Sequence, residues 1–288
     1  FLLNRKRAME FREGVLKAGK PLSVFAFASI RAISQYSVTE ILEMGIDGVW
    51  IGYEGTRSGY AKQTGRPVEE IFREFKEHGI SILASMIVGF PYQTPEFIEE
   101  ELSGLLALNP VLTQFLIYGP SPGTPFFERV MKEGLLDPAV VADPELFCKK
   151  GSGFYSLVKH PVMAPEEIEA AQERCFNEDF RRLGPSIYRS LDTWLRGYQK
   201  LKDSPNPHLR LMAGQFKAKI RNAYPVFLAG RLFGPSAVAR RGIAQLQTRI
   251  HAELGAPTLK ERLMSPAAAG MAALTALTLK LDFLQHPS

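Results

Sequence analysis

The feature that most constrains this 288-residue chain is a regular alternation of short apolar runs with helix-forming segments in its first half. The apolar runs occupy residues 22–28, 48–52, 81–88 and 113–118. Runs that are apolar at nearly every position are typical of parallel strands covered on both faces. Their alternation with helices indicates βα units. The sequence therefore predicts an α/β fold, either an open doubly wound sheet or a whole or partial barrel.

Capping residues signal where the helices of this half begin. An amphipathic pattern covers residues 4–18, and Ser37 and Glu40 have the spacing of a capping box. Thr94 and Thr124 each precede a proline, as an N-cap residue does when proline takes the first helical position. These signals predict a helix before the first strand and helices between and after the later ones.

The second half of the chain has a different pattern. Residues 134–164 contain Asp-Pro dipeptides and several glycines, so we expect them to be irregular. From residue 186 onward only helical patterns occur, with breaks at residues 204–207, 234–235 and 255–257. The chain is thus predicted to end in a helical region.

The net charge of +5 hides an asymmetry along the chain. Residues 1–176 carry 18 basic and 23 acidic residues, whereas residues 177–288 carry 17 and 7, a net charge of +10. A basic helical region could rest on anionic lipid, bind nucleic acid, or simply form a solvated face. No RNA-binding or helix-turn-helix motif occurs, so no nucleic-acid partner is expected. The uncharged run 265–279 is shorter than the roughly 18–20 residues of a membrane span, so we expect a packing or interfacial helix there.

The chain contains only two cysteines, Cys148 and Cys175, and no pair of histidines at metal-binding spacing. This excludes a disulfide framework and a zinc site built from the chain's own cysteines. We expect both cysteines to be packing residues of a cytoplasmic protein. The sequence starts with Phe1 inside what reads as a structural element, without a signal peptide, which predicts a fragment lacking its N-terminal part.

One sequence match lacks a group that its chemistry requires. Residues 119–123 fit the GxSxG pattern of serine hydrolases. That site needs the backbone N–H of the residue after the serine, and here this residue is Pro122, which has none. No phosphate-binding glycine loop of either common type occurs.

Polar and glycine residues follow three of the expected strands. Ser29 and Arg31 follow the first, Gly52 and Glu54 the second, and Gly89 the third. Ligands of parallel βα folds bind at these carboxyl ends. Arg31 suits a carboxylate, Glu54 suits hydroxyls or a cation, and the glycines would let a flat ring approach the backbone. Alternatively, Arg31 and Glu54 pair with each other and the glycines are turn residues.

The order of these motifs resembles a known family. FLLNRKRAMEF, SIR, EMGIDGVWIGYEG, GISILASMIVGFP followed by QTPE, and YGPSPGTPF are similar to segments of the radical S-adenosylmethionine enzymes, in particular their cobalamin-binding branch. The resemblance covers residues 1–133. It implies the second part of a partial (β/α)6 TIM-like barrel, with S-adenosylmethionine, a [4Fe-4S] cluster and cobalamin as cofactors of the intact protein.

The resemblance also implies a set of cofactor-binding residues, while it assigns no catalytic residue. Residues after the first strand would contact the methionine or ribose part, residues after the second would lie beside the adenosine, and the third strand would present its backbone to the adenine. These positions are Ser29, Arg31, Gly52, Glu54, Ile87, Val88 and Gly89.

The chain departs from the family in one respect. The CxxxCxxC motif that holds the cluster is absent, and Cys148 and Cys175 cannot replace it. A cobalamin domain is also absent. We therefore expect a partial barrel at residues 1–134, a connecting segment at 135–185 and a basic helical region at 186–288, which would be inactive on their own.

The function implied for the intact protein is that of a cobalamin-dependent methyltransferase. It would act on an unactivated carbon of a small molecule or a lipid, with peripheral membrane contact through the basic helices. Two alternatives remain open: a non-catalytic interaction module on a degenerate half barrel, and an ordinary barrel metabolic enzyme that uses Glu54 as an acid–base residue.

Overall fold

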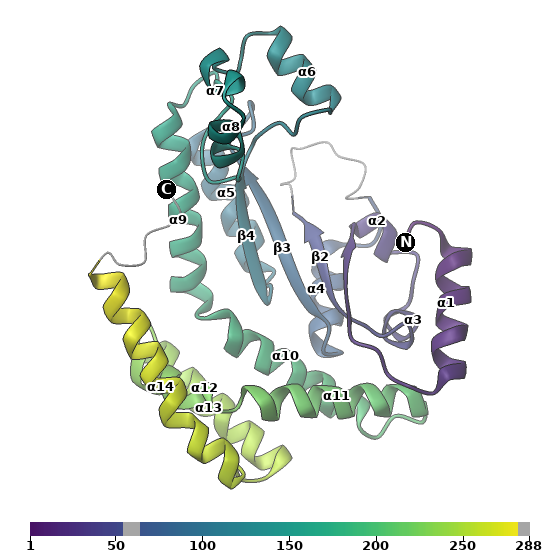
Figure 1. The fold of residues 1–288 in the computed structure, drawn as a ribbon. Helices are drawn as coiled ribbons and strands as arrows, with labels where there is room; N and C mark the ends of the chain where they lie inside the picture. Colours follow the sequence, from purple (N-terminus) through teal and green to yellow (C-terminus); the bar gives the residue numbers. More distant parts are fainter. Residues whose placement is uncertain (54–63, 282–288) are drawn as a thin grey trace.

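The computed structural model describes residues 1–53 and 64–281 and contains one parallel sheet (Figure 1). Its strands are β1 (Val24–Ala28), β2 (Ile46–Gly52), β3 (Ser81–Val88) and β4 (Leu112–Ile117). They lie side by side in the order β1-β2-β3-β4, and all three neighbouring pairs are parallel. The four predicted strands and the α/β fold are therefore confirmed.

The helices that connect the strands all lie behind the sheet in Figure 1. They are α2 (Ile30–Ile33), α3 (Val38–Glu43), α4 (Val68–Glu77) and α5 (Pro95–Ala107). Because βαβ crossovers are right-handed, strands added in sequential order place successive helices on the same face. A doubly wound sheet reverses its strand order and covers both faces. The described strands thus form a singly wound sheet that stays open, and the partial barrel stays a prediction.

The predicted helix starts are also present. Asn4 caps α1 (Arg5–Ala18), and Ser37 and Glu40 form the reciprocal capping box of α3. Thr94 and Thr124 accept hydrogen bonds from backbone N–H groups of α5 and α6 (Pro125–Lys132). Each capping oxygen satisfies a helix N–H that has no partner within its own helix.

The prediction of an irregular segment at residues 134–164 is wrong in part. Two short helices lie there, α7 (Pro138–Ala142) and α8 (Pro144–Lys150). Asp137 and Asp143 cap them, and each is followed by a proline in the first helical turn. The Asp-Pro dipeptides that suggested irregular structure are therefore helix starts of the same kind as Thr94-Pro95.

The rest of the chain is helical, as expected. The three predicted breaks separate most of its helices, and one further break near Pro225 was not predicted. The helices are α9 (Pro165–Leu183), α10 (Ser186–Leu201), α11 (Pro207–Ala223), α12 (Val226–Phe233), α13 (Ala237–Leu254) and α14 (Leu259–Lys280). Within residues 1–53 and 64–281, no helix combines the length and the apolar character needed to cross a membrane.

Three clusters of buried apolar side chains hold these elements together. The largest takes side chains from the sheet, from α3 to α5 and from α9 to α11. A second lies among α10 to α13, and a third joins α6, α7 and residues 157–158. The largest cluster therefore draws on all three predicted regions, whose boundaries stay a prediction.

Helix α10 crosses the turn between α4 and β3 at unusually close range. Gly79 has φ +84°, which a side chain would make unfavourable, and it lies directly against Gly197 of α10. A Cβ atom on Gly197 would lie 2.4 Å from the Gly79 Cα, and one on Gly79 would lie 2.5 Å from the Phe216 ring. Two glycines thus permit backbone contact between the helical region and the amino-terminal end of the sheet.

A buried ion pair reinforces the same junction. Arg189 of α10 donates to both carboxylate oxygens of Asp179 in α9, at 2.9 and 2.8 Å, and to the Pro110 carbonyl at 3.2 Å. Both charged side chains are almost fully buried. Because removing one partner would leave an unpaired charge in the interior, the pair strongly favours this one arrangement of α9, α10 and the start of β4.

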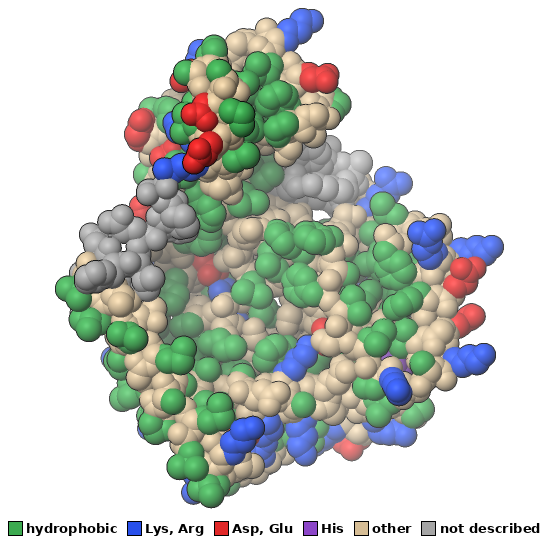
Figure 2. Space-filling model, viewed as in Figure 1, with side chains coloured by type: hydrophobic (Ala, Val, Ile, Leu, Met, Phe, Trp, Pro, Cys, Tyr) green, Lys and Arg blue, Asp and Glu red, His purple; other side chains and the backbone are tan. Residues whose placement is uncertain are grey.

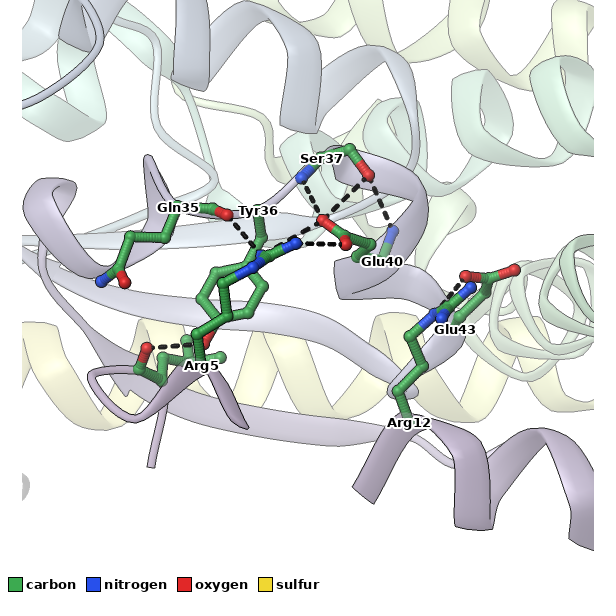
Figure 3. A network of polar contacts seen from close by, with 8 residues as sticks. Arg5, Arg12, Gln35, Tyr36, Ser37, Glu40 and Glu43 are labelled. Atoms are coloured by element: carbon green, nitrogen blue, oxygen red, sulfur yellow. Dashed lines mark hydrogen bonds and ion pairs between the residues drawn. The ribbon is translucent and has the colours of Figure 1, made fainter. Parts of the chain in front are cut away.

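Carboxylates of α3 tie the amino-terminal helix to the same body (Figure 3). Glu43 accepts from Arg12 of α1 at 2.6 Å and from Asn206, which precedes α11, at 2.7 Å. Glu40 accepts from Arg5 at 2.7 Å while it also completes its capping box. The short helix α3 therefore links α1 to the start of α11.

We predict that Gly197→Ala lowers stability by about 1–3 kcal/mol, since the added methyl group would overlap the Gly79 backbone and force α10 away. The matched control is Gly214→Ala on α11, where an added Cβ meets nothing within 4 Å. That control should raise stability by up to about 1 kcal/mol because alanine favours helices. Urea denaturation of both variants measures the difference, and equal stabilities would contradict the close contact.

Candidate functional site

The candidate site is the face of the sheet that no connecting helix covers. Residues that alternate along β1 to β4 point either into the large core or onto this open face. On β1, Phe25 and Phe27 are 50% and 76% exposed. The expectation that both faces are covered is therefore wrong, because the sequential strand order places the connecting helices on one side only. Figure 2 shows hydrophobic side chains across the hollow centre of the open face.

Aromatic side chains form the first row across this face. Phe27 stacks on Trp50 with ring centroids 4.6 Å apart, and Leu83 and Leu112 continue the row in register. The ring of Phe25 lies over Gly48, where an added Cβ would be 2.4 Å from a ring atom. Exposed aromatic surface of this kind fits a ligand or another protein segment better than it fits water.

A polar row lies next to it, nearer the carboxyl ends of the strands. Gly52, Ser85 and Gln114 are register partners on β2, β3 and β4. The Oε1 atom of Gln114 is buried and has no hydrogen-bond partner within the described part of the chain. A buried acceptor without a donor is unfavourable, so the Gln114 amide would gain a hydrogen bond by turning toward a donor of a ligand on the open face. Ile87 and Leu116 form the next, apolar row.

Helices frame the open face on several sides (Figure 1). In that view α9 borders the β4 side, α10 and α11 lie below, α1 stands beyond β1, and α6 to α8 lie above the carboxyl ends of the strands. Within this frame the face carries one polar row between apolar rows.

The residues predicted at the first two strand ends lie at different places. The Ser29 hydroxyl caps α2 and accepts from the Ala32 N–H at 3.2 Å. Arg31 is exposed on α2 and forms no ion pair with the described residues. Gly52 ends β2 on the open face. Glu54, predicted to bind a ligand or to pair with Arg31, lies outside the described residues.

The third predicted group surrounds the end of β3. Ile87 points onto the open face, whereas Val88 is buried against the helices. The Val88 carbonyl accepts from the Tyr118 N–H at 2.8 Å, which continues the pairing with β4. Gly89 turns the chain with φ +88°. Part of this backbone is thus already hydrogen-bonded within the protein.

Sequence reasoning missed Gln93, which holds this turn together. Its Oε1 atom accepts from the N–H groups of Gly89 and Phe90, at 2.7 and 2.8 Å. Its Nε2 group donates to the Ile87 carbonyl at 3.1 Å and to Glu101 at 2.6 Å. Gln93 is only 1% exposed, so a fully bonded amide replaces water at the end of β3.

His160 fixes the other side of the same turn. Its Nδ1 atom accepts from the N–H groups of Val162 and Met163, at 3.2 and 3.1 Å. The Nε2 atom therefore carries the proton and donates to the Phe90 carbonyl at 2.9 Å. The His160 ring thus bridges Phe90 and residues 162–163 through its two nitrogens.

Two cavities lie near the ends of the strands. One of about 440 Å³ is lined by Tyr118, Phe126, Arg129 and His160, and Tyr118 stacks there at 4.6 Å from Phe126. Another of about 590 Å³ lies on the helix side of the sheet. Tyr53 lines it, and burial, followed by the charges of Glu101, Glu69 and Glu100, raises the pKa of its phenol. The larger cavity lies behind the sheet, and of the polar row only Gly52 also lines it.

Neither the sequence nor the structure offers a cluster site on this chain. In the described residues, no three His, Cys, Asp or Glu side chains gather as metal ligands do. Cys175 is buried, and burial raises the pKa of its thiol to about 12. Cys148 is exposed, so the expectation that it is a packing residue is wrong. Two separate thiols do not fit an iron–sulfur cluster, which needs three thiolates in one place.

Fold and site together define an α/β protein with a singly wound parallel sheet, one face of which no connecting helix covers. No family model matches the chain. It is similar to a protein of Pyrococcus horikoshii named Uncharacterized methyltransferase PH0819, with 26% identity over 141 residues. The match covers 47% of this chain and 31% of that protein, so the chain spans about a third of the curated relative's length.

We predict that a thiol reagent at pH 8 modifies Cys148 rapidly and Cys175 only after unfolding. With its pKa at about 12, Cys175 has almost no reactive thiolate at that pH, and the core also shields it. Counting modified thiols without and with denaturant should give one and two per chain, respectively. Cys148→Ser should abolish the rapid reaction, and two rapid thiols in the folded protein would contradict the buried position of Cys175.

We also predict that Gln93→Leu lowers stability by about 2–4 kcal/mol, since it leaves two buried N–H groups without an acceptor. The matched control is Gln245→Leu, at an exposed position of α13. That change should alter stability by less than about 0.5 kcal/mol. Thermal denaturation of both variants tests the assignment, and a neutral Gln93→Leu would show that the amide does not organise the turn.

Proposed function

We propose that this chain is the carboxyl-terminal part of a radical S-adenosylmethionine enzyme, and that the complete protein is a cobalamin-dependent methyltransferase. The observation that carries the proposal is the open sheet face, with its polar row of Gly52, Ser85 and Gln114 between apolar rows. The order of motifs along residues 1–133 and the printed name of the Pyrococcus horikoshii relative support the same reading.

The open face suits S-adenosylmethionine in three respects. Gly52 has no side chain, so a flat adenine ring can lie against the backbone of β2. The unpaired Oε1 atom of Gln114 can accept from the adenine amino group, which glutamine side chains recognise well. Arg31 is an exposed cation near the end of β1 and can bind the methionine carboxylate.

The residues of this chain would bind and orient the cofactor and keep water out. When bound, S-adenosylmethionine supplies the group that reacts. The floor of aromatic and aliphatic side chains excludes water from its neighbourhood, which strengthens each polar contact there. An apolar floor also fits a substrate with a substantial hydrocarbon part, such as a lipid, or a small molecule of similar character.

The cluster and cobalamin do not fit this chain. Its two cysteines lie on α8 and on the buried side of α9, and neither has a second thiol beside it. In this proposal, residues outside the chain hold both groups. The proposal therefore assigns only the S-adenosylmethionine and substrate surface to residues 1–134.

We predict that the chain binds S-adenosylmethionine and that Gln114→Leu weakens binding by about tenfold or more. Loss of one hydrogen bond to a buried acceptor corresponds to about 1.4 kcal/mol or more. Gly52→Val should weaken binding similarly, because its side chain would occupy the place of the ring. Isothermal titration calorimetry measures both affinities.

The matched controls are Gln245→Leu and Gly14→Ala, which lie on exposed helix surfaces away from the sheet face. Their affinities should equal that of the unchanged chain within twofold. No binding by the chain, or equal affinity of Gln114→Leu and its control, would overturn the assignment. Equal affinity for adenosine triphosphate would instead point to a general adenine site.

A further inference from the structure

Helix α14 carries an exposed apolar stripe along its whole length. The members of this stripe are spaced three to eight residues apart and are each 53–73% exposed: Leu259, Leu263, Met271, Leu274, Leu277 and Leu281. With a rise of about 1.5 Å per residue, the helix is about 33 Å long. A single exposed leucine needs no explanation, but a stripe of this length indicates a contact surface.

The opposite side of α14 is already occupied. The helix packs along α12, and Ala269 is almost completely buried there. Small residues predominate in its middle, where residues 265–273 contain only Ser, Pro, Ala, Gly and Met. The stripe therefore faces away from the protein. Figure 2 shows hydrophobic side chains along α14 at the lower left of the molecule.

The three helices α12 to α14 are strongly basic. Residues 226–280 contain seven Lys and Arg and two acidic residues. Both acids are bonded within the protein: Glu253 pairs with Lys202, and Glu261 pairs with Arg221 at 3.3 Å. Four of the cations are exposed and form no ion pair with the described residues: Arg231, Arg241, Lys260 and Arg262.

We propose that the stripe of α14 and the neighbouring cations bind an anionic phospholipid surface, with α14 lying in the plane of the membrane. An apolar stripe inserts among acyl chains at the boundary with the headgroups, while Lys and Arg side chains pair with anionic headgroups. Charge complementarity decides the partner. A second copy of the chain would bring two basic surfaces together, and nucleic acid would leave the apolar stripe in water.

The experiment is flotation of the chain with vesicles. We expect binding to phosphatidylcholine vesicles that contain about one third phosphatidylserine, and little binding to phosphatidylcholine alone. Raising the NaCl concentration from 0.1 to about 0.5 M should weaken binding several-fold, because salt screens exposed charges. Equal binding to both vesicles, or none to either, would overturn the proposal.

Two sets of variants separate the apolar from the charged contribution. The double variant Met271→Glu, Leu274→Glu should reduce vesicle binding about tenfold or more. Its control is the double variant Leu3→Glu, Val162→Glu, which places the same charges at equally exposed apolar positions elsewhere. A triple variant that combines Arg231→Gln, Arg241→Gln and Lys260→Gln should also reduce vesicle binding tenfold or more. The control for this triple variant is Lys6→Gln, Lys17→Gln and Lys20→Gln in and just after α1.

The expected result is that both control sets bind within twofold of the unchanged chain. Controls that fall as far as the α14 variants would overturn the assignment to α14. A concentration-dependent dimer in size-exclusion chromatography that the Met271→Glu, Leu274→Glu variant abolishes would assign the stripe to a second copy instead. Since flotation needs no S-adenosylmethionine, its outcome is independent of the proposed function.

Discussion

The constraint on which the rest of the structure depends is the sequential order of four parallel strands. Right-handed crossovers then place every connecting helix on one face, and the other face keeps its aromatic and aliphatic side chains half exposed. The helices that follow β4 do not cover this face but border it. Parallel sheets normally have both faces covered. The open face therefore leaves apolar surface of the sheet uncovered, and binding of a ligand or of a further protein segment there would be favourable.

Much of the fold could be predicted because local chemistry and the global arrangement agree. The strands are largely apolar, and Ser37, Thr94 and Thr124 are strong caps at the helix starts. Helices α7 and α8 could have been found as well, since Asp137 and Asp143 are caps of the same kind. They were missed because Asp-Pro also begins turns, and short helices leave no periodic pattern.

The candidate site was harder to predict, and the reasons are physical. Gly52 was predicted because strand ends are recognisable and Ile87 because the resemblance implied it, whereas Ser85 and Gln114 lie inside apolar runs and meet only through strand register. Gln93 stood in the QTPE segment of the resemblance but received no role, since three of its four partners are backbone groups whose positions depend on the turn it stabilises. The amino-acid pattern of an apolar strand is also the same whether its second face packs against a helix or binds a ligand. The open face could therefore not be inferred from the sequence.

The contact between Gly79 and Gly197 has a consequence for how the chain folds during synthesis. These residues are 118 positions apart, yet their backbones touch at the amino-terminal end of the sheet. All four strands leave the ribosome long before α10 and α11 can close that end and bring Phe216 against Gly79. Nascent chains stopped between β4 and α10 should therefore be those most in need of chaperones, because their largest core is still open to water.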